Sequence, residues 1–183
     1  MLYIIRHGMT DWNSLRILQG QTDIALNAEG RQMAIDARND RPVQPFDICF
    51  SSPLVRAKET AELFLEGTKT PIIVDERLKE LGFGICEGTK HAARNPESPV
   101  YSLFHAPEQY RGVEGGETLD ELFARTGEFL YEEILPRHKK GERILIVGHG
   151  AMNCSIISQL KNTERAHFWD HMTKNCELKL ILE

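Results

Sequence analysis

Three short polar clusters follow apolar runs in this sequence, and each combines ionisable side chains with small residues. They are Arg6-His7-Gly8, Ser51-Ser52 with Arg56, and Gly148-His149-Gly150. The preceding apolar runs predict buried strands, and an open α/β sheet binds its ligands outside the carboxyl ends of the strands. If the three strands are parallel neighbours, two arginines and two histidines converge on one point.

This convergence predicts phosphoryl transfer. Guanidinium groups offer planar forks of donors that suit a phosphate dianion, and Arg6 and Arg56 would supply two of them. Arg56 would lie in the first turn of a helix, where free backbone N–H groups add positive potential. A neutral imidazole can attack phosphorus, and a second imidazole, if protonated, can balance charge on the transferring oxygens.

Each cluster alone has a simpler interpretation. A single histidine at a strand end is more often structural than catalytic, and a single arginine in a first helical turn is usually a solvated surface charge. Three clusters in the same position relative to a strand favour a functional site over these separate explanations.

The elements around the clusters predict an α/β fold, because short apolar runs alternate with helical patterns. Strands are expected at 2–7, 47–52, 71–76, 143–149 and 176–183, and helices at about 28–38, 53–65, from 119 onward and at 151–160. The expected architecture is a three-layer α/β/α sandwich with a mostly parallel central sheet and an antiparallel edge strand at the C-terminus. The length of 183 residues suits one domain spanning 1–183.

Helix starts are marked by capping residues. Asn27 is expected to cap the helix at 28–38, with Met33 and Ala37 among its inward residues. Ser52 is expected to cap the next helix, with Pro53 at its first position. Thr118-Leu-Asp-Glu121 reads as a capping box.

Two apolar patterns predict buried faces. The helix after Thr118 carries a stripe at helical spacing, and 176–183 alternates with one face expected to be covered. The stripe is Leu119, Leu122, Phe123, Thr126, Phe129, Leu130 and Ile134, and the covered strand face is Cys176, Leu178, Leu180 and Leu182.

Residues 84–116 contain three prolines and no clean periodicity, which predicts a long irregular excursion, and excursions of this length are usually functional. We expect it to act as a lid. Its aromatic and imidazole side chains, which suit a substrate with an apolar or ring-bearing part, are Tyr101, Phe104, His105 and Tyr110.

Bulk properties narrow the function. The net charge of −5 argues against non-specific nucleic-acid binding, and no apolar run reaches the length of a membrane span. No secretory signal is recognised, and the four cysteines form no CxxC pair, so we expect reduced thiols and a cytoplasmic protein. Cys49 is interpreted as core, and His167 with His171 as surface or packing residues rather than metal ligands.

The sequence resembles the histidine phosphatase, or phosphoglycerate mutase-like, superfamily. The segments that carry the likeness are RHGMTDWN (6–13), RILQGQTDIALNAEGRQMA (16–34), SSPLVRAKETA (51–61), RLKELGFGICEG (77–88), GGET (115–118) and VGHG (147–150). Together they span most of the chain in the family's order and spacing. Met9 stands where the family often has glutamate, at a position that is not catalytic there.

The resemblance implies a role for each site residue. His7 becomes the phosphohistidine, Arg6 and Arg56 hold the phosphate, His149 stabilises the transition state, and Glu80 protonates the leaving oxygen. Composition alone does not separate Glu80 from Glu76 or Glu87. The residues implied to line the substrate pocket are Asn13, Gln19, Gly20, Gln21 and Gly150, with no metal and no cofactor.

The family contains phosphatases and mutases, and the sequence favours a phosphatase. The cofactor-dependent mutases of the family that this sequence resembles are longer chains, with an insertion whose paired arginines bind the substrate carboxylate and second phosphate. Here the arginines of the excursion, Arg94 and Arg111, are far apart in sequence. The length and the GGET segment resemble small phosphatases, including alpha-ribazole phosphatase and broad-specificity relatives. The expected partner is a small phosphomonoester substrate, and a homodimer is possible.

Two other functions stay open: a cofactor-dependent phosphoglycerate mutase, and a module that binds phosphorylated ligands without turnover. A binder needs only the arginines, so the presence of His7, Glu80 and His149 counts against the second. We also expect His7, Arg56 and His149 to face a cleft rather than the core, so that replacing them lowers thermal stability little.

Overall fold

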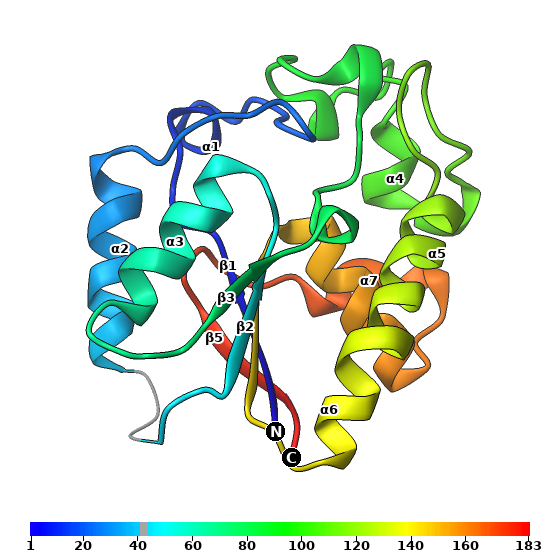
Figure 1. The fold of residues 1–183 in the computed structure, drawn as a ribbon. Helices are drawn as coiled ribbons and strands as arrows, with labels where there is room; N and C mark the ends of the chain where they lie inside the picture. Colours follow the sequence, from blue (N-terminus) through cyan, green and yellow to red (C-terminus); the bar gives the residue numbers. More distant parts are fainter. Residues whose placement is uncertain (41–43) are drawn as a thin grey trace.

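The computed structural model describes residues 1–40 and 44–183, and its centre is a five-stranded sheet with the order β3-β2-β4-β1-β5 (Figure 1). The strands are β1 (Leu2–Arg6), β2 (Ile48–Ser51), β3 (Ile72–Val74), β4 (Ile144–Gly148) and β5 (Leu178–Leu182). Neighbouring pairs among β1 to β4 are parallel, and β5 pairs antiparallel with β1. The expected fold class is confirmed.

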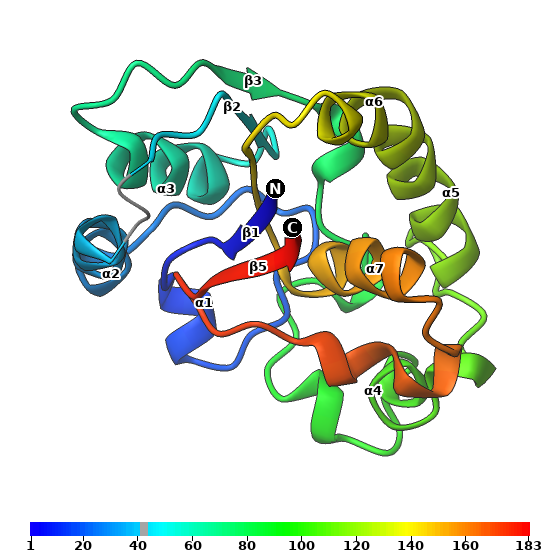
Figure 2. The ribbon, with the colours of Figure 1, turned by 90° about the horizontal axis from the view of Figure 1, so that it is seen from below.

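Helices cover both faces of the sheet. They are α1 (Asp11–Ser14), α2 (Ala28–Asn39), α3 (Val55–Leu65), α4 (Tyr101–His105), α5 (Leu119–Phe129), α6 (Leu135–Lys139) and α7 (Gly150–Lys161). Figure 2 shows α2 and α3 on one side of the strands and α5, α6 and α7 on the other. No described helix is long and apolar enough to cross a membrane.

The two faces of the sheet have separate apolar cores because successive side chains of a strand point to opposite faces. In β1, Leu2 and Ile4 belong to the core beneath α5 and α7, whereas Tyr3 and Ile5 belong to the core beneath α2 and α3. Such a strand, buried on both faces, reads as a continuous apolar run, which is why the sequence identified it.

The strand register brings the three polar clusters to one edge. Arg6 pairs with Gly148 across β1 and β4, and Ser51 pairs with Val147 across β2 and β4. Because these strands are parallel neighbours, the residues that follow them leave the sheet side by side. The convergence expected from sequence is therefore present.

Two of the three helix starts were correctly predicted. The Asn27 side chain accepts a hydrogen bond from the Gly30 amide, and Thr118 forms a capping box with Glu121. The third start was wrong, since α3 begins at Val55 rather than at Pro53. The Val55 amide donates to the carboxylate of Asp23, from a distant loop, while the Ser52 hydroxyl accepts from the Leu54 amide and contacts His149.

The amphipathic stripe after Thr118 is confirmed. Its residues in α5 are buried except Phe123, which packs partly buried against the same core. The backbone then passes through one π-helical stretch at Leu130–Ile134, still buried at both ends, before α6. This long helical segment covers the core on the α7 side of the sheet.

The prediction that one face of the last strand is covered is only partly correct. Leu178 packs against the core beneath α2 and α3, but Leu182 packs against the opposite core, and Leu180 is exposed. A β-bulge opposite Leu2 and Tyr3 shifts the register of β5, so that the last side chains of this strand point to the other face of the sheet. Simple alternation therefore misassigned the side chains beyond the bulge.

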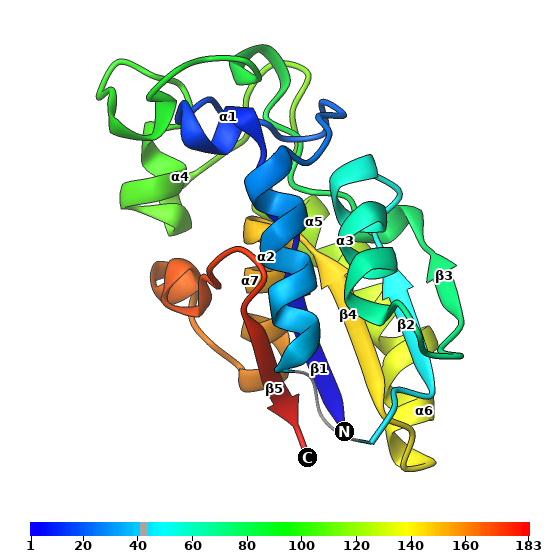
Figure 3. The ribbon, with the colours of Figure 1, turned by 90° about the vertical axis from the view of Figure 1, so that its left-hand side faces the viewer.

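Residues 84–116 form a series of tight turns and the short α4. The turns are 3₁₀ stretches at Gly84–Cys86, Ala92–Arg94 and Pro107–Gln109. In Figure 3 this segment, with α4, lies beyond the carboxyl ends of the central strands. It therefore flanks the edge at which the polar clusters converge.

Candidate active site

Two imidazole rings form the centre of the site. The ring centroids of His7 and His149 lie 5.1 Å apart, and both side chains are buried. An adjoining pocket is lined by His7 but not by His149. The full lining is Arg6, His7, Asn13, Ile17, Leu18, Gln19, Gly20, Arg56, Glu80, Phe83, Phe104, Gly150, Ala151, Trp169 and Met172.

His7 is held as a neutral imidazole with a defined tautomer. Its Nδ1 lies 2.7 Å from the Gly8 carbonyl oxygen, which can only accept, so Nδ1 carries the proton and Nε2 keeps its lone pair. Burial, followed by the charges of Arg56 and Arg6, lowers the pKa of His7 well below its usual range. The ring is therefore uncharged at neutral pH.

Asn175 fixes the turn that carries His7. Its side-chain amide donates to the His7 carbonyl at 2.7 Å and to the Gly8 carbonyl at 3.3 Å. Sequence reasoning missed Asn175 because it lies far along the chain and no local pattern marks it. Its neighbour Cys176 bonds through its amide to the Arg6 carbonyl, which aligns this segment with the end of β1.

His149 is also neutral in the structure. Burial is the main cause that lowers the pKa of His149 well below its usual range, and the nearby Arg56 adds to it. Its Nε2 lies 2.7 Å from the Ser52 hydroxyl, which already accepts from the Leu54 amide. Nε2 is the acceptor that the Ser52 hydroxyl contacts, so we assign the Ser52 proton to this bond, which leaves Nδ1–H of His149 as a donor.

Arg56 is fully buried at the site. Its Nη1 donates to the Thr22 carbonyl at 2.9 Å, and its Nη2 donates to the Gly20 carbonyl at 2.7 Å. Burial lowers the pKa of Arg56 to about 10, so the guanidinium stays charged at neutral pH. Arg56 lines the pocket, as expected, and its side chain also supports the adjacent loop. His149, which was also expected to face the cleft, is fully buried and does not line the pocket.

Glu87 secures that loop. Its Oε1 accepts from the amides of Gln21 and Phe83, and its Oε2 accepts from the Thr22 amide. Gly20 adopts a left-handed backbone with φ of +56°, and a Cβ there would lie 2.0 Å from Oε1 of Glu87. Glycine is thus required where the loop passes this carboxylate.

Several buried nitrogens at the site have no partner within residues 1–40 and 44–183. They are Nε of Arg6, Nε of Arg56 and Nδ1 of His149. Arg6 is otherwise held by a bond of 3.1 Å from Nη1 to the Thr173 carbonyl. Buried donors are normally satisfied, so a group of unpaired ones beside a pocket points to an anionic ligand.

Glu80 lines the pocket against the N-terminus of α7. Its Oε1 accepts from the amides of Leu81 at 2.8 Å and Met152 at 3.0 Å, and its Oε2 accepts from Ala151 at 3.2 Å. Of Glu76, Glu80 and Glu87, Glu80 is the glutamate that lines the pocket. The structure makes the distinction that composition could not.

Four of the five further residues expected at the pocket line it, namely Asn13, Gln19, Gly20 and Gly150. Asn13 and Gln19 are linked through Thr10, whose hydroxyl bonds to Oδ1 of Asn13 and to Oε1 of Gln19, each at 3.0 Å. Gln21 does not line the pocket. Its side chain turns to the Glu80 carbonyl and to Glu117 instead.

Fewer of the aromatic and imidazole side chains of the excursion line the pocket than the sequence predicted. Phe104 alone of the four expected side chains lines the pocket, while Tyr101 and His105 stack on each other and Tyr110 is buried in the core. Phe104 stacks on Trp169 with 5.1 Å between ring centroids. Trp169 packs against the core beneath α5 and α7 and also forms part of the pocket wall.

The two histidines that the sequence analysis rejected as metal ligands have other contacts. His167 pairs with Asp170 at 3.0 Å, and His171 contacts the Thr163 hydroxyl at 2.7 Å. In the described part of the chain no three His, Cys, Asp or Glu side chains are placed to hold a metal ion together. Cys49 is buried, and burial raises the pKa of its thiol, as a core role requires.

A family model described as the histidine phosphatase superfamily (branch 1) matches residues 2–182. A 2,3-bisphosphoglycerate-dependent phosphoglycerate mutase of Cytophaga hutchinsonii is 33% identical over 164 residues, which is 88% of this chain and 77% of the relative. The solved structure of YhfR from Bacillus stearothermophilus aligns with a TM-score of 0.87 and 32% identity, covering 97% of this chain and 88% of YhfR.

Two solved phosphatases are also similar. A mycobacterial glucosyl-3-phosphoglycerate phosphatase, in complex with VO3, aligns with a TM-score of 0.78 and 27% identity over 97% of this chain and 90% of its own. The alpha-ribazole phosphatase of Shigella flexneri, at 24% identity and a TM-score of 0.82 over 97% of this chain and 87% of its own, shares the fold. The chain therefore belongs to the histidine phosphatase superfamily, branch 1, and is an enzyme of that family.

Proposed function

We propose that this enzyme is a metal-independent phosphomonoesterase that works through a phosphohistidine on His7. The observation that carries the proposal is the neutral His7 ring, with Nε2 unprotonated, beside two arginines that each retain an unpaired Nε. A nucleophile needs a free lone pair, and a dianionic substrate needs donors that the protein itself leaves unused.

The reaction proceeds in two steps. Nε2 of His7 attacks phosphorus, the bond from phosphorus to the ester oxygen breaks, and the leaving oxygen takes a proton from the Glu80 carboxyl. Glu80 then accepts a proton from water as the water oxygen attacks the phosphohistidine, which releases inorganic phosphate and restores His7. His149 Nδ1–H, Arg6 and Arg56 stabilise the charge on the equatorial oxygens.

A mutase is the second candidate, and one observation favours it. A groove next to the pocket, sharing Ile17, Leu18 and Phe104 with it, is lined also by the cations Arg16 and Arg94, together with His91. In the sequence, Arg94 is far from Arg111, the other arginine of the excursion, but in the structure it lines this groove together with Arg16. Such a groove suits a substrate with a second anionic group, as a phosphoglycerate has.

The assay that separates the two candidates is turnover of a phosphomonoester panel with and without 2,3-bisphosphoglycerate. We expect inorganic phosphate to be released from the panel members, at rates that the bisphosphate does not raise. 3-Phosphoglycerate included in the panel should lose phosphate rather than isomerise. Isomerisation that depends on the bisphosphate, with little phosphate release, would establish the mutase instead. Binding without either reaction would favour a module that only binds phosphorylated ligands.

Removal of metal ions is expected to leave activity intact. The arginines already supply the positive charge that a metal would otherwise provide. Hydrolysis of p-nitrophenyl phosphate should continue after dialysis against excess EDTA, and vanadate should inhibit it competitively because it mimics pentacoordinate phosphorus. Activity lost in EDTA and regained with zinc or magnesium would contradict a metal-independent mechanism.

A further inference from the structure

The GGET segment, 115–118, runs beside the residues that follow Glu80. The Glu117 amide donates to the Gly82 carbonyl at 2.8 Å, and the Gly82 amide donates back to Oε2 of Glu117 at 2.8 Å. Phe83 and Gly116 form an antiparallel bridge. The segment is therefore anchored two residues beyond the proposed acid.

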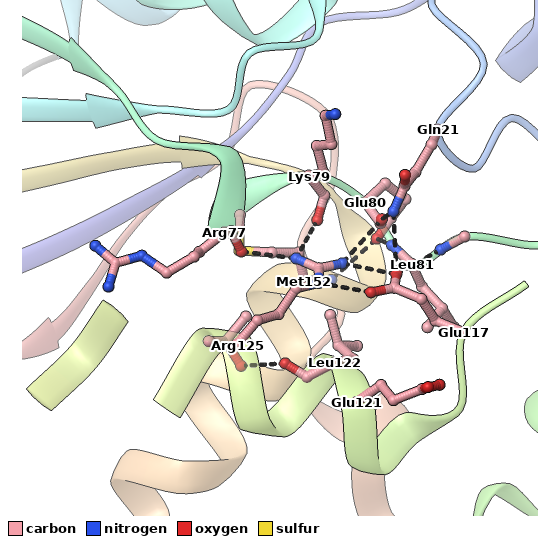
Figure 4. A network of polar contacts seen from close by, with 12 residues as sticks. Gln21, Arg77, Lys79, Glu80, Leu81, Glu117, Glu121, Leu122, Arg125 and Met152 are labelled. Atoms are coloured by element: carbon pink, nitrogen blue, oxygen red, sulfur yellow. Dashed lines mark hydrogen bonds and ion pairs between the residues drawn. The ribbon is translucent and has the colours of Figure 1, made fainter. Parts of the chain in front are cut away.

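Arg125, from α5, ties Glu117 to the backbone that leads into Glu80. Its Nε and Nη2 bond to the two oxygens of Glu117 at 2.8 and 2.9 Å, a bidentate pair (Figure 4). Its Nη1 donates to the carbonyls of Arg77 and Lys79 at 2.6 and 2.8 Å, and Nη2 also donates to the Glu80 carbonyl at 3.0 Å. One guanidinium thus holds three carbonyls between Arg77 and Glu80, a segment that leaves a 3₁₀ turn at Glu76–Leu78.

Gln21 connects this network to the loop that carries the acceptors of Arg56. Its side-chain amide donates to the Glu80 carbonyl and to Oε2 of Glu117, each at 3.1 Å. Figure 4 shows Gln21, Arg125 and Glu117 meeting around the backbone of Glu80. The Glu80 carbonyl consequently has two side-chain donors, while the Glu80 carboxylate accepts from the backbone amides of Leu81, Ala151 and Met152.

We propose that Arg125 and Glu117 are positioning residues for Glu80, an inference that rests on the proposed acid role of that carboxyl. Neither side chain lines the pocket, so neither contacts the reacting atoms. They act by fixing the backbone from which the Glu80 side chain extends. Proton transfer to the leaving oxygen depends on that position, because general acid catalysis needs hydrogen-bond distance.

The test compares an alkyl with an aryl phosphate. An alkoxide leaves poorly without a proton, whereas p-nitrophenolate leaves readily, so loss of the acid slows the alkyl substrate selectively. Glu80→Gln is the reference, with an expected loss of kcat on glycerol phosphate of about 10²- to 10⁴-fold. For Arg125→Gln we expect a selective loss of about a hundredfold, the scale that a displacement of about 1 Å produces.

Two further variants make the result decisive. Glu117→Gln keeps the shape of the side chain but weakens the bidentate pair, and it should show the same alkyl selectivity with a smaller loss if Arg125→Gln folds poorly. Arg165→Gln is the matched control: it removes an arginine that bonds to a carboxylate, that of Asp120, and to a backbone carbonyl, that of Leu119, and these bonds do not involve Glu80 or Glu117. It should leave the alkyl-to-aryl ratio unchanged.

The double variant Glu80→Gln with Arg125→Gln should be little slower on the alkyl substrate than Glu80→Gln alone, since both changes remove one function. Equal losses on both substrates in Arg125→Gln and Glu117→Gln, or fully additive losses in the double variant, would overturn the positioning role and leave the proposed acid role of Glu80 intact. Equal losses in Glu80→Gln itself would overturn the acid assignment of the proposed function, and the positioning role with it.

Discussion

Replacing His7 with alanine is expected to abolish the phosphoenzyme and reduce kcat on the order of a million-fold, the scale seen when covalent catalysis loses its nucleophile. The reason is structural: His7 is the residue whose neutral ring leaves Nε2 free beside the unpaired arginine donors. Rapid quench with a radiolabelled phosphomonoester, followed by peptide mapping, should place an acid-labile, base-stable label on His7 in the unmodified enzyme and none in His7→Ala.

Two histidine variants serve as controls for this experiment. His149→Ala removes one charge-stabilising donor and should slow labelling about a hundred- to a thousand-fold without preventing it. His167→Ala, at an exposed ring paired with Asp170, should label as the unmodified enzyme does. A label on Cys49, Ser51 or Ser52, or one that persists in His7→Ala, would identify a different nucleophile.

Replacing Arg56 with alanine is expected to weaken both the fold and the binding of phosphate. The side chain is fully buried, and its loss leaves the carbonyls of Gly20 and Thr22 without these donors. Each unsatisfied buried acceptor costs about 1–3 kcal/mol, so the free energy of unfolding should fall by about 3 kcal/mol, measured by urea denaturation. The inhibition constant for vanadate should rise at least about tenfold.

Matched substitutions separate the two effects. Arg56→Lys keeps the charge but cannot bond to two carbonyls and a phosphate at once, so turnover should fall although part of the stability is retained. Arg31→Ala removes a half-exposed arginine paired with Glu59 and should change the unfolding free energy by less than about 1 kcal/mol. An Arg56→Ala variant as stable as Arg31→Ala would show that the guanidinium does not support the loop.

Local sequence patterns were sufficient to predict the fold class and most elements. Strand β1 reads as a continuous apolar run because both its faces are covered, and the capping residues Asn27 and Thr118 act on amides within three positions of themselves. The convergence at the sheet edge followed from parallel neighbouring strands. The apolar runs and the caps are short-range properties, because the residues that produce them are near one another in the chain, whereas the strand pairing joins residues distant in sequence.

The predictions that failed depended on partners distant in sequence. The start of α3 is set by Asp23, from another loop, and the face of β5 is set by a bulge opposite β1. The Gln21 side chain bonds to Glu117 rather than lining the pocket. Of the four aromatic and imidazole side chains expected to face the substrate, Phe104 lines the pocket, where it stacks on Trp169. No local pattern encodes such contacts.

The sequence by itself determined which side chains can carry the chemistry, since His7, Arg6, Arg56 and His149 follow apolar runs that form strands. Tertiary structure alone decided their state. The depressed pKa values of His7 and His149 arise from burial and from the charge of Arg56, and the tautomer of His7 from the Gly8 carbonyl. Such states depend on desolvation and on interatomic distances, which exist only once the chain has folded.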